Sequence, residues 1–255
     1  VAPTALRRLA AAFIYRDFRV LWLGAFTSSV GTWMQKVAQS WLVLTLTGSP
    51  LFLGLDAFLG ELPILLFTLI GGVVADRRDR RRLLLGSQYV QMSAAFILAG
   101  LVYSGHVRIS YILALSFATG CAQAFGGPAY QSLIPSLVQK GDLPNAIALN
   151  SIQFNLARVV GPLLAGAALA AFGTVSCFTL NGLSFLVVIL ALMSLHVKHI
   201  APAAPQPILH ELRVGLSYVK HQGALLTLTV LAFATTFLGI PLLTFLPVFA
   251  QKVFH

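Results

Sequence analysis

Long apolar windows separated by short polar or charged turns repeat along the chain. Seven windows have the roughly 20 residues that a helix needs to cross about 30 Å of hydrocarbon. They cover residues 20–45, 51–75, 83–104, 109–134, 145–171, 174–195 and 224–250. The first window runs past signal-peptide length and has no small-residue cleavage pattern before the second. The pattern predicts an all-α, multi-pass membrane protein without a cleavable signal peptide.

Composition and charge support a membrane protein and argue against a nucleic-acid partner. Of 255 residues, 58% are hydrophobic and 9% charged, which excludes an ordinary soluble domain. The net charge of +10 follows from topology, because an amino terminus in the cytoplasm puts thirteen of the 17 Lys and Arg on the cytoplasmic side. Only Arg108 and Lys252 fall outside. The basic loops are therefore placed to contact anionic lipid of the bilayer.

The chain divides into three parts. Residues 1–195 form a six-span bundle, and residues 196–223 form a cytoplasmic linker with three prolines in its first half. The second half of the linker, 208–222, has apolar residues at a 3.6-residue period, which predicts an amphipathic helix on the membrane surface. Residues 224–255 then provide the first span of an incomplete second bundle.

Other chemistry is not indicated by the sequence. Cys121 and Cys177 fall in predicted spans without metal-ligand spacing, so each is predicted to pack as a small apolar residue. His196 and His199 are spaced for a metal, but they have no third partner and are predicted to be solvated. The sequence contains no phosphate loop, metal-ligand cluster or nucleophile elbow. We therefore expect no cofactor, no bound metal and no enzyme activity.

The string GGVVADRRDRRRLLL, residues 71–85, is the most informative one. Seven charges in residues 76–82 cannot enter a bilayer, so they define a short loop between the second and third spans. This loop resembles the one between the second and third helices of major facilitator superfamily transporters. The matching residues are Gly72, Ala75, Asp76, Arg77, Arg80, Arg81 and Leu84. The family often has a second glycine where Asp79 stands, and a plain stop-transfer cluster is the alternative interpretation.

The fifth span carries a second resemblance. Gly161-Pro162 followed by Ala165-Gly166 is similar to a motif in the fifth helix of facilitator exporters. In that motif the glycines permit close helix approach and the proline bends the helix. The family has two glycines where this chain has Ala165-Gly166, and Ala157 replaces an upstream glycine. Generic packing of small residues is the alternative.

Together with the string at 31–50, these motifs resemble the bacterial enterobactin-exporter and macrolide-efflux subgroup of the superfamily. The resemblance implies a six-helix half-bundle of inverted three-helix repeats. It also implies proton-coupled export of a small amphiphilic compound, such as a drug or siderophore-like molecule, across the bacterial cytoplasmic membrane, together with a second half missing from this chain. A lysophospholipid or solute transporter and a truncated non-transporting component are the alternatives. By the same resemblance Asp76 acts as a gate at a helix end of the other half, and the loop arginines anchor to lipid phosphate.

Ionisable residues within spans are the best indicators of a site, because a charge at the centre of a spanning helix costs roughly 2.5–3.5 kcal/mol on insertion scales. Four stand out: Lys36, Asp56, Glu61 and Arg158. Asn155 shares a helix face with Arg158. These residues are candidates for coupling or substrate binding, with structural pairing as the alternative. Asp56 is close to the predicted outer surface, where pairing or hydration is favoured over function.

Polar stripes predict which faces line a water-filled cavity. The first span has Ser28, Thr32, Gln35 and Gln39 around Lys36, and the fourth span has Ser116, Thr119 and Gln123. The family often has an arginine in the fourth helix, and this chain has none there. The stretch 184–193 of the sixth span is apolar on all sides, which is typical of a lipid-facing support helix.

The first two spans predict an ion pair. The turn between them centres between Gly48 and Ser49, and Lys36 and Glu61 lie 12.5 residues to either side. Antiparallel helices rising about 1.5 Å per residue place both groups at similar depth. A pair offsets much of the cost of two isolated charges. Protonation of Glu61 could then free Lys36 for substrate or water, and a purely structural pair is the equal alternative.

Overall fold

The computed structural model describes residues 11–196 and 217–252, and within them all regular structure is helical. The long helices are α2 (Arg16–Thr47), α3 (Pro50–Arg77), α4 (Arg80–Tyr103), α5 (Ile109–Leu133), α6 (Leu143–Met193) and α8 (Gly223–Lys252). Short 3-10 turns cover Ala11–Ile14, Ile134–Ser136 and Lys140–Asp142. The expected all-α fold is confirmed. Most of the predicted linker and amphipathic helix lies outside the described residues, although 217–221 are helical.

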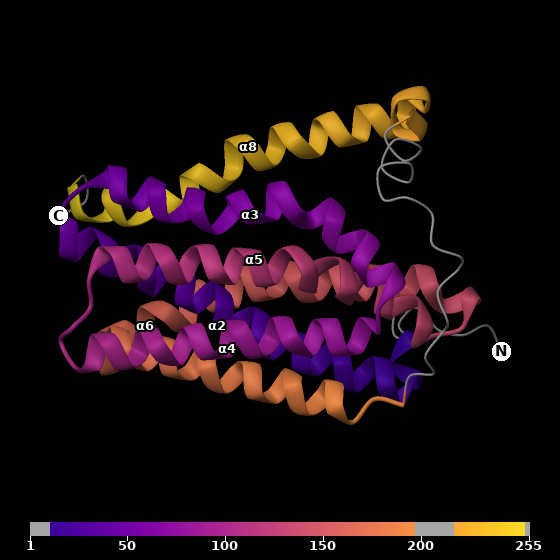
Figure 1. Cartoon of the computed structure of the whole chain (residues 1–255), viewed down its shortest axis with the longest axis horizontal. Coiled ribbons are helices and arrows are strands. Elements are labelled where there is room, and N and C mark those ends of the chain that lie inside the picture. Colours follow the sequence, from indigo (N-terminus) through magenta and orange to yellow (C-terminus); the bar gives the residue numbers. More distant parts are fainter. Residues whose placement is uncertain (1–10, 197–216, 253–255) are drawn as a thin grey trace.

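The helix α6 contains two of the predicted spans. Its backbone breaks at Gly173, where φ is 73° and ψ is −175°, a conformation that favours glycine. The two parts, 143–172 and 174–193, run in opposite directions (Figure 1). The Ser176 hydroxyl donates a hydrogen bond to the Gly173 carbonyl at 2.6 Å and closes this turn. The predicted boundary between the fifth and sixth spans lies at this break.

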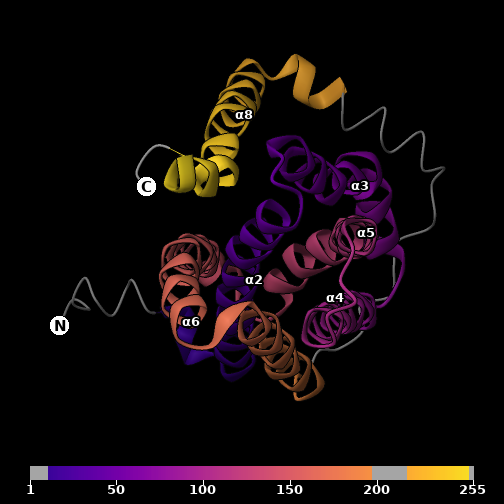
Figure 2. The same cartoon turned by 90° about the vertical axis from the view of Figure 1, so that its left-hand side faces the viewer.

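The bundle is held together by contacts between its first three and its last three spans. α2 packs on α6, α3 packs on α5, and α4 packs on both α5 and α6, whereas the consecutive helices α3 and α4 barely touch. α8 contacts α2 and α3 and lies at the edge of the bundle (Figure 2). Most of the contacts that bury a helix face are therefore made with helices distant in sequence, and α4 with α5 is the consecutive pair that packs closely.

Gly161 sets the closest approach between α2 and α6. A Cβ at this position would lie 2.5 Å from the Cβ of Trp33 and 2.9 Å from the carbonyl oxygen of Val30. Ala157 and Ala165, one turn to either side, are fully buried. The packing role expected for Gly161 is confirmed.

Gly166 does not have the packing role expected of it. It is exposed, and a Cβ added there would meet no atom within 4 Å. The stripe that faces α2 is Ala157–Gly161–Ala165, at spacings of four. Gly166 follows Ala165 and points about 100° round the helix from that stripe. Pro162 lies inside α6 and is partly buried.

Small residues also bring α3 close to α5. A Cβ on Gly71 would collide with the carbonyl oxygen of Ala124, and a Cβ on Gly120 would collide with the carbonyl oxygen of Gly60. Gly72, the motif position, has no such neighbour within 4 Å. Close packing below the charged loop therefore depends on Gly71 rather than on Gly72.

The second part of α6, predicted to be a lipid-facing support helix, has one buried face and one exposed apolar face. Phe178, Phe185, Ile189 and Leu192 are buried, while Leu186 and Leu190 on the other face are exposed. An all-apolar sequence fits a protein core as well as lipid, and here packing against α2 and α4 decides the buried face.

Four described helical stretches are long and apolar enough to cross a membrane: Pro50–Arg77, Arg80–Tyr103, Ile109–Ser136 and Lys140–Met193. The last has 54 residues, which is enough for two spans. α2 has 32 residues but is not among them, because polar residues run through its central turns. The expectation that α2 spans the membrane rests on its place within the bundle.

Single cysteines test the predicted topology. In a background with Cys121→Ala and Cys177→Ala, we expect an impermeant thiol reagent on intact cells to label Ser104→Cys and to spare Arg82→Cys. Ser104 lies in the exposed α4–α5 loop, and Arg82 lies at the start of α4 in the charged loop. Both cysteines should be labelled after permeabilisation. Labelling of position 82 but not of position 104 on intact cells would show that the chain has the opposite orientation in the membrane.

Candidate functional site

The predicted ion pair between the first two spans is present. The Lys36 Nζ lies 3.2 Å from the Glu61 Oε1, with the two side chains 54% and 51% exposed. Both groups therefore lie on an open side of the bundle, and the match in depth comes from the short turn that joins α2 to α3. The geometry of the pair is confirmed, and its role in coupling remains a prediction.

Aromatic rings join this pair to Arg158. The Lys36 Nζ lies 5.0 Å and the Arg158 Cζ 5.5 Å from the centroid of the Trp33 ring, within the range of cation–π attraction. Phe154 meets Trp33 edge-on at 6.1 Å. We call this group the cationic face: Trp33, Lys36, Glu61, Phe154, Asn155 and Arg158.

The sequence analysis missed both aromatic residues of the cationic face. A usable signal exists, because Trp33 precedes Lys36 by three residues and Phe154 precedes Arg158 by four, so each ring shares a helix face with its cation. Asn155 is exposed and donates a hydrogen bond to the Ser151 carbonyl of its own helix. The face has two cations and one acid, so it is electropositive and attracts anions. At membrane depth such a face must be covered by protein or water.

Asp56 lies in a different environment from Glu61. Its side chain is only 7% exposed, so the interpretation that it is hydrated is wrong. Gln39 Nε2 donates to the Asp56 carboxylate oxygens at 3.1 and 2.8 Å, and the Ser116 hydroxyl donates at 2.5 Å. Asp56 thus joins α3 to α2 and α5 through neutral partners.

An amide chain leads from α6 to Asp56. Asn181 Nδ2 donates to Gln35 Oε1 at 2.7 Å, and Gln35 Nε2 donates to Gln39 Oε1 at 3.4 Å. Gln39 then donates to Asp56. Gln35 and Gln39, predicted to line a cavity, therefore form hydrogen bonds between helices. Asn181 was not selected from the sequence, where it precedes an all-apolar stretch.

The remaining residues of the predicted polar stripes make local contacts. Ser28 is buried and donates to the Ala25 carbonyl, so it does not line an open surface. Thr32 is partly buried and donates to the Ser28 carbonyl. Gln123 is exposed on α5. A hydroxyl that donates to a carbonyl one turn back in its own helix needs no water. The polar stripe therefore predicted more cavity-lining residues than the structure has.

The charged loop ties helix ends together. Arg80 lies 3.5 Å from Asp76 and donates to the Ser132 carbonyl at 3.0 Å, near the end of α5. Arg81 donates to the Met193 carbonyl at 2.6 Å, at the end of α6. A cation is favourable where helix carbonyls are left unpaired. Arg80 and Arg81 therefore bind these carbonyls, whereas the resemblance implied lipid phosphate. Arg77 is the last residue of α3.

Asp79, which departs from the family pattern, has a structural role. It is the N-cap of α4, and its carboxylate accepts a hydrogen bond from the Arg82 backbone N–H at 3.1 Å. A capping side chain satisfies an otherwise unpaired N–H at the helix start. Asp79 therefore fixes the start of α4 at Arg80, shortly after α3 ends at Arg77.

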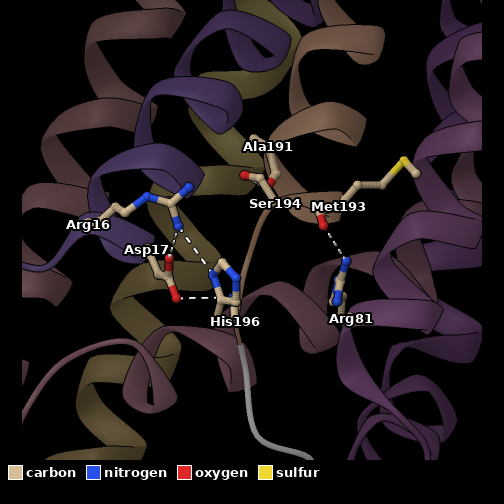
Figure 3. A network of polar contacts seen from close by, with 7 residues as sticks. All are labelled: Arg16, Asp17, Arg81, Ala191, Met193, Ser194 and His196. Atoms are coloured by element: carbon tan, nitrogen blue, oxygen red, sulfur yellow. Dashed lines mark hydrogen bonds and ion pairs between the residues drawn. The ribbon is translucent and has the colours of Figure 1, made fainter.

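A further polar network lies at the same end of the bundle (Figure 3). The Asp17 Oδ2 accepts a hydrogen bond from the His196 backbone N–H at 3.1 Å, and Arg16 lies against the other oxygen of Asp17. Arg16 also contacts the His196 Nδ1 at 3.3 Å. His196 thus joins α2 to the end of α6, although it was predicted to be only solvated. His199 lies outside the described residues.

Tyr15, just before α2, forms a second connection at this end. Its hydroxyl donates to the Asp142 Oδ2 at 2.7 Å. That hydrogen bond to a carboxylate raises the pKa of Tyr15 above its ordinary value, because it stabilises the neutral phenol. The starts of α2 and α6 and the end of α6 are therefore connected at one end of the bundle.

Comparison with known proteins identifies the family. The family model described as "Transmembrane secretion effector", of the major facilitator superfamily, matches residues 9–255. The chain belongs to this family. It is 29% identical over 237 residues to the staphyloferrin A transporter of Staphylococcus aureus, covering 90% of this chain and 58% of that protein.

Two other relatives are similar to a comparable extent. The multidrug efflux pump Tap of Mycolicibacterium fortuitum is 28% identical, with 86% of this chain and 56% of the pump covered. The enterobactin exporter EntS of Citrobacter koseri is 29% identical, with 80% and 46% covered. The chain thus spans about half the length of the curated relatives that it matches.

Membership in the facilitator family confirms the main expectations from the sequence. The family and these relatives are transporters rather than enzymes, and the chain is a multi-pass membrane protein. The loop at 71–85 indicated the superfamily, and together with the string at 31–50 and the fifth-span motif it indicated the exporter subgroup. The family does not establish which residues bind substrate or protons, so the cationic face and Asp56 carry the functional argument.

Proposed function

We propose that the chain is half of an exporter that moves a small amphiphilic compound across the bacterial cytoplasmic membrane, driven by protons. The amino terminus faces the cytoplasm, and a second six-helix bundle completes the path. The observation that carries this proposal is the cationic face, where Lys36 and Arg158, both within predicted spans, lie against the ring of Trp33. A compound with an aromatic or apolar body and an anionic group fits such a face.

The names of the relatives agree with this chemistry. Two of those named above handle siderophores by name, staphyloferrin A and enterobactin, and a third is a multidrug efflux pump. A siderophore-like anion would contact both cations, whereas a neutral drug would use mainly the rings of Trp33 and Phe154. Transport follows from rocking of the two bundles, which exposes the cationic face first to one side and then to the other.

The Lys36–Glu61 pair gives a coupling step for this cycle. While Glu61 is ionised it holds Lys36 at 3.2 Å and competes with an anionic substrate. Protonation of Glu61 would remove that competitor and leave the ammonium group for substrate or water. Proton binding and substrate binding would then be linked through one side chain.

An efflux assay tests the proposed function. Cells that express the complete transporter should accumulate less of a catecholate siderophore or a fluorescent macrolide than cells with an empty vector, and a protonophore should abolish the difference. Arg158→Gln should weaken export of the anionic siderophore more than export of the macrolide, because it removes one of two cations. Movement of a labelled lysophospholipid with neither of the other compounds would contradict the proposal.

Asp76 provides a separate prediction about the gating loop. We expect Asp76→Asn in the complete transporter to reduce turnover while leaving substrate affinity nearly unchanged, because Asp76 lies in the charged loop, away from the cationic face, and contacts Arg80. A direct binding measurement alongside transport rates separates the two quantities. Asp79→Asn is the matched control, since asparagine also caps helices. Lost affinity with normal turnover of the bound fraction would contradict a gating role.

A further inference from the structure

Asp56 is a buried acid that the coupling step described above does not use. It is 7% exposed, and its hydrogen-bond partners Gln39 and Ser116 are both neutral. Glu61, five residues further along α3, has Lys36 as an ionic partner. Lys36 on α2 also attracts the Asp56 carboxylate, but its ammonium group is ion-paired with Glu61. Because both hydrogen-bond partners of Asp56 are neutral, an ionised carboxylate at this depth is costly, so its charge is sensitive to proton binding.

The amide chain determines what Asp56 can bind. Gln39 presents its N–H₂ group to Asp56, because its carbonyl oxygen already accepts from Gln35, whose own oxygen accepts from Asn181. The three amides point their donors in one direction, toward the carboxylate. A hard metal cation needs oxygen ligands around it, and an N–H₂ group occupies that space. The geometry favours a proton as the ligand.

Ser116 allows the site to hold both protonation states. A hydroxyl is a donor and an acceptor with two lone pairs, so Ser116 can donate to the ionised Asp56 and accept from the protonated acid, while its oxygen also accepts from Gln39 Nε2 at 2.8 Å. Gln39 remains a donor to the other oxygen in both states. A proton can therefore arrive and leave while Gln39 and Ser116 both stay hydrogen-bonded to the carboxyl group.

Its depth places Asp56 between the predicted outer surface and the ion pair. It lies six residues after Pro50, the first residue of α3, or about 9 Å along the helix axis. Glu61 lies about 7.5 Å deeper. A proton that enters from the outside, as export driven by protons requires, reaches Asp56 before Glu61.

We propose that Asp56, held by Gln39 and Ser116, is the outer proton-binding site of the transporter. This inference rests on the proposed proton-driven export. A proton from the outside binds Asp56 first. When Asp56 releases it, the proton binds Glu61 of the Lys36–Glu61 pair. The amide chain links this site to the second part of α6 through Asn181, whereas Arg158 of the cationic face lies in the first part, before the break at Gly173.

The variant Asp56→Asn separates proton coupling from substrate binding. Asparagine resembles the protonated acid in shape, since its N–H₂ can donate to Ser116 while its oxygen accepts from Gln39. With the complete transporter in proteoliposomes, and the siderophore or macrolide that the wild type exports, we expect substrate exchange at equal pH to persist. Uphill transport driven by a pH gradient should be lost. Retention of gradient-driven transport by Asp56→Asn would overturn the proposal.

Infrared difference spectroscopy gives a readout that needs no substrate. A pH titration of the wild type should show the carbonyl band of a carboxylic acid that Asp56→Asn lacks and Asp56→Glu restores at a shifted position. If the band instead persists in Asp56→Asn and disappears in Glu61→Gln, the proton site is Glu61 and the proposal is wrong. A wild type that binds this proton but exports none of the compounds refutes the proposed export while leaving Asp56 as a proton site.

Discussion

Replacing Glu61 alone by methionine is expected to lower the amount of folded protein in the membrane more than replacing Lys36 and Glu61 together. The single change leaves the Lys36 ammonium without its carboxylate at 3.2 Å. A lone charge near the bilayer centre costs roughly 2.5–3.5 kcal/mol on insertion scales. The half-exposed position and the Trp33 ring reduce that cost but do not remove it. The double change removes both charges and with them the penalty.

A double-mutant cycle measures this effect. The four proteins are the wild type, Lys36→Met, Glu61→Met and the double variant, compared by expression and by thermal unfolding in detergent. The matched control is the Asp79–Arg82 pair, at 3.5 Å with the arginine side chain 87% exposed. Such a surface pair typically contributes about 0–1 kcal/mol. If the coupling energy between Lys36 and Glu61 is no larger than that of the Asp79–Arg82 pair, the Lys36–Glu61 pair neither stabilises the bundle nor couples proton binding to transport.

Gly161→Ala is expected to destabilise the bundle, whereas Gly166→Ala is not. At position 161 the new methyl would meet the Cβ of Trp33 at 2.5 Å and the Val30 carbonyl oxygen at 2.9 Å, so α2 and α6 must separate. Overpacking of this kind costs about 1–3 kcal/mol. At position 166 no atom lies within 4 Å, and alanine is the better helix former by about 1 kcal/mol.

The two glycine variants differ in function as well as in stability. Because Gly161 lies against Trp33, a shift of α2 there would move the ring that Lys36 and Arg158 share. Thermal unfolding in detergent and efflux measured on the same preparations test both effects. Equal losses for Gly161→Ala and Gly166→Ala would show that α2 does not pack at Gly161 as described.

The sequence was sufficient for features that depend on one helix or on two consecutive ones. A spanning helix must be apolar along its length, so hydropathy alone locates most spans, and the charges of the 76–82 loop exclude it from the bilayer. The Lys36–Glu61 pair was predictable for a related reason. A turn of two residues between antiparallel helices fixes their register, so depth can be counted from it.

Tertiary structure decided what each polar or small residue contacts. A stripe of amides satisfies its hydrogen bonds equally well with water or with another helix, so the sequence did not distinguish a cavity from the chain Asn181–Gln35–Gln39–Asp56. Gly161 and Gly166 have the same chemistry, and only the position of α2 makes one of them essential. Each span can be located from its own segment of sequence, because a helix surrounded by lipid must be apolar along its length. The buried acid and the cationic face follow from helices distant in the chain, which only packing brings together.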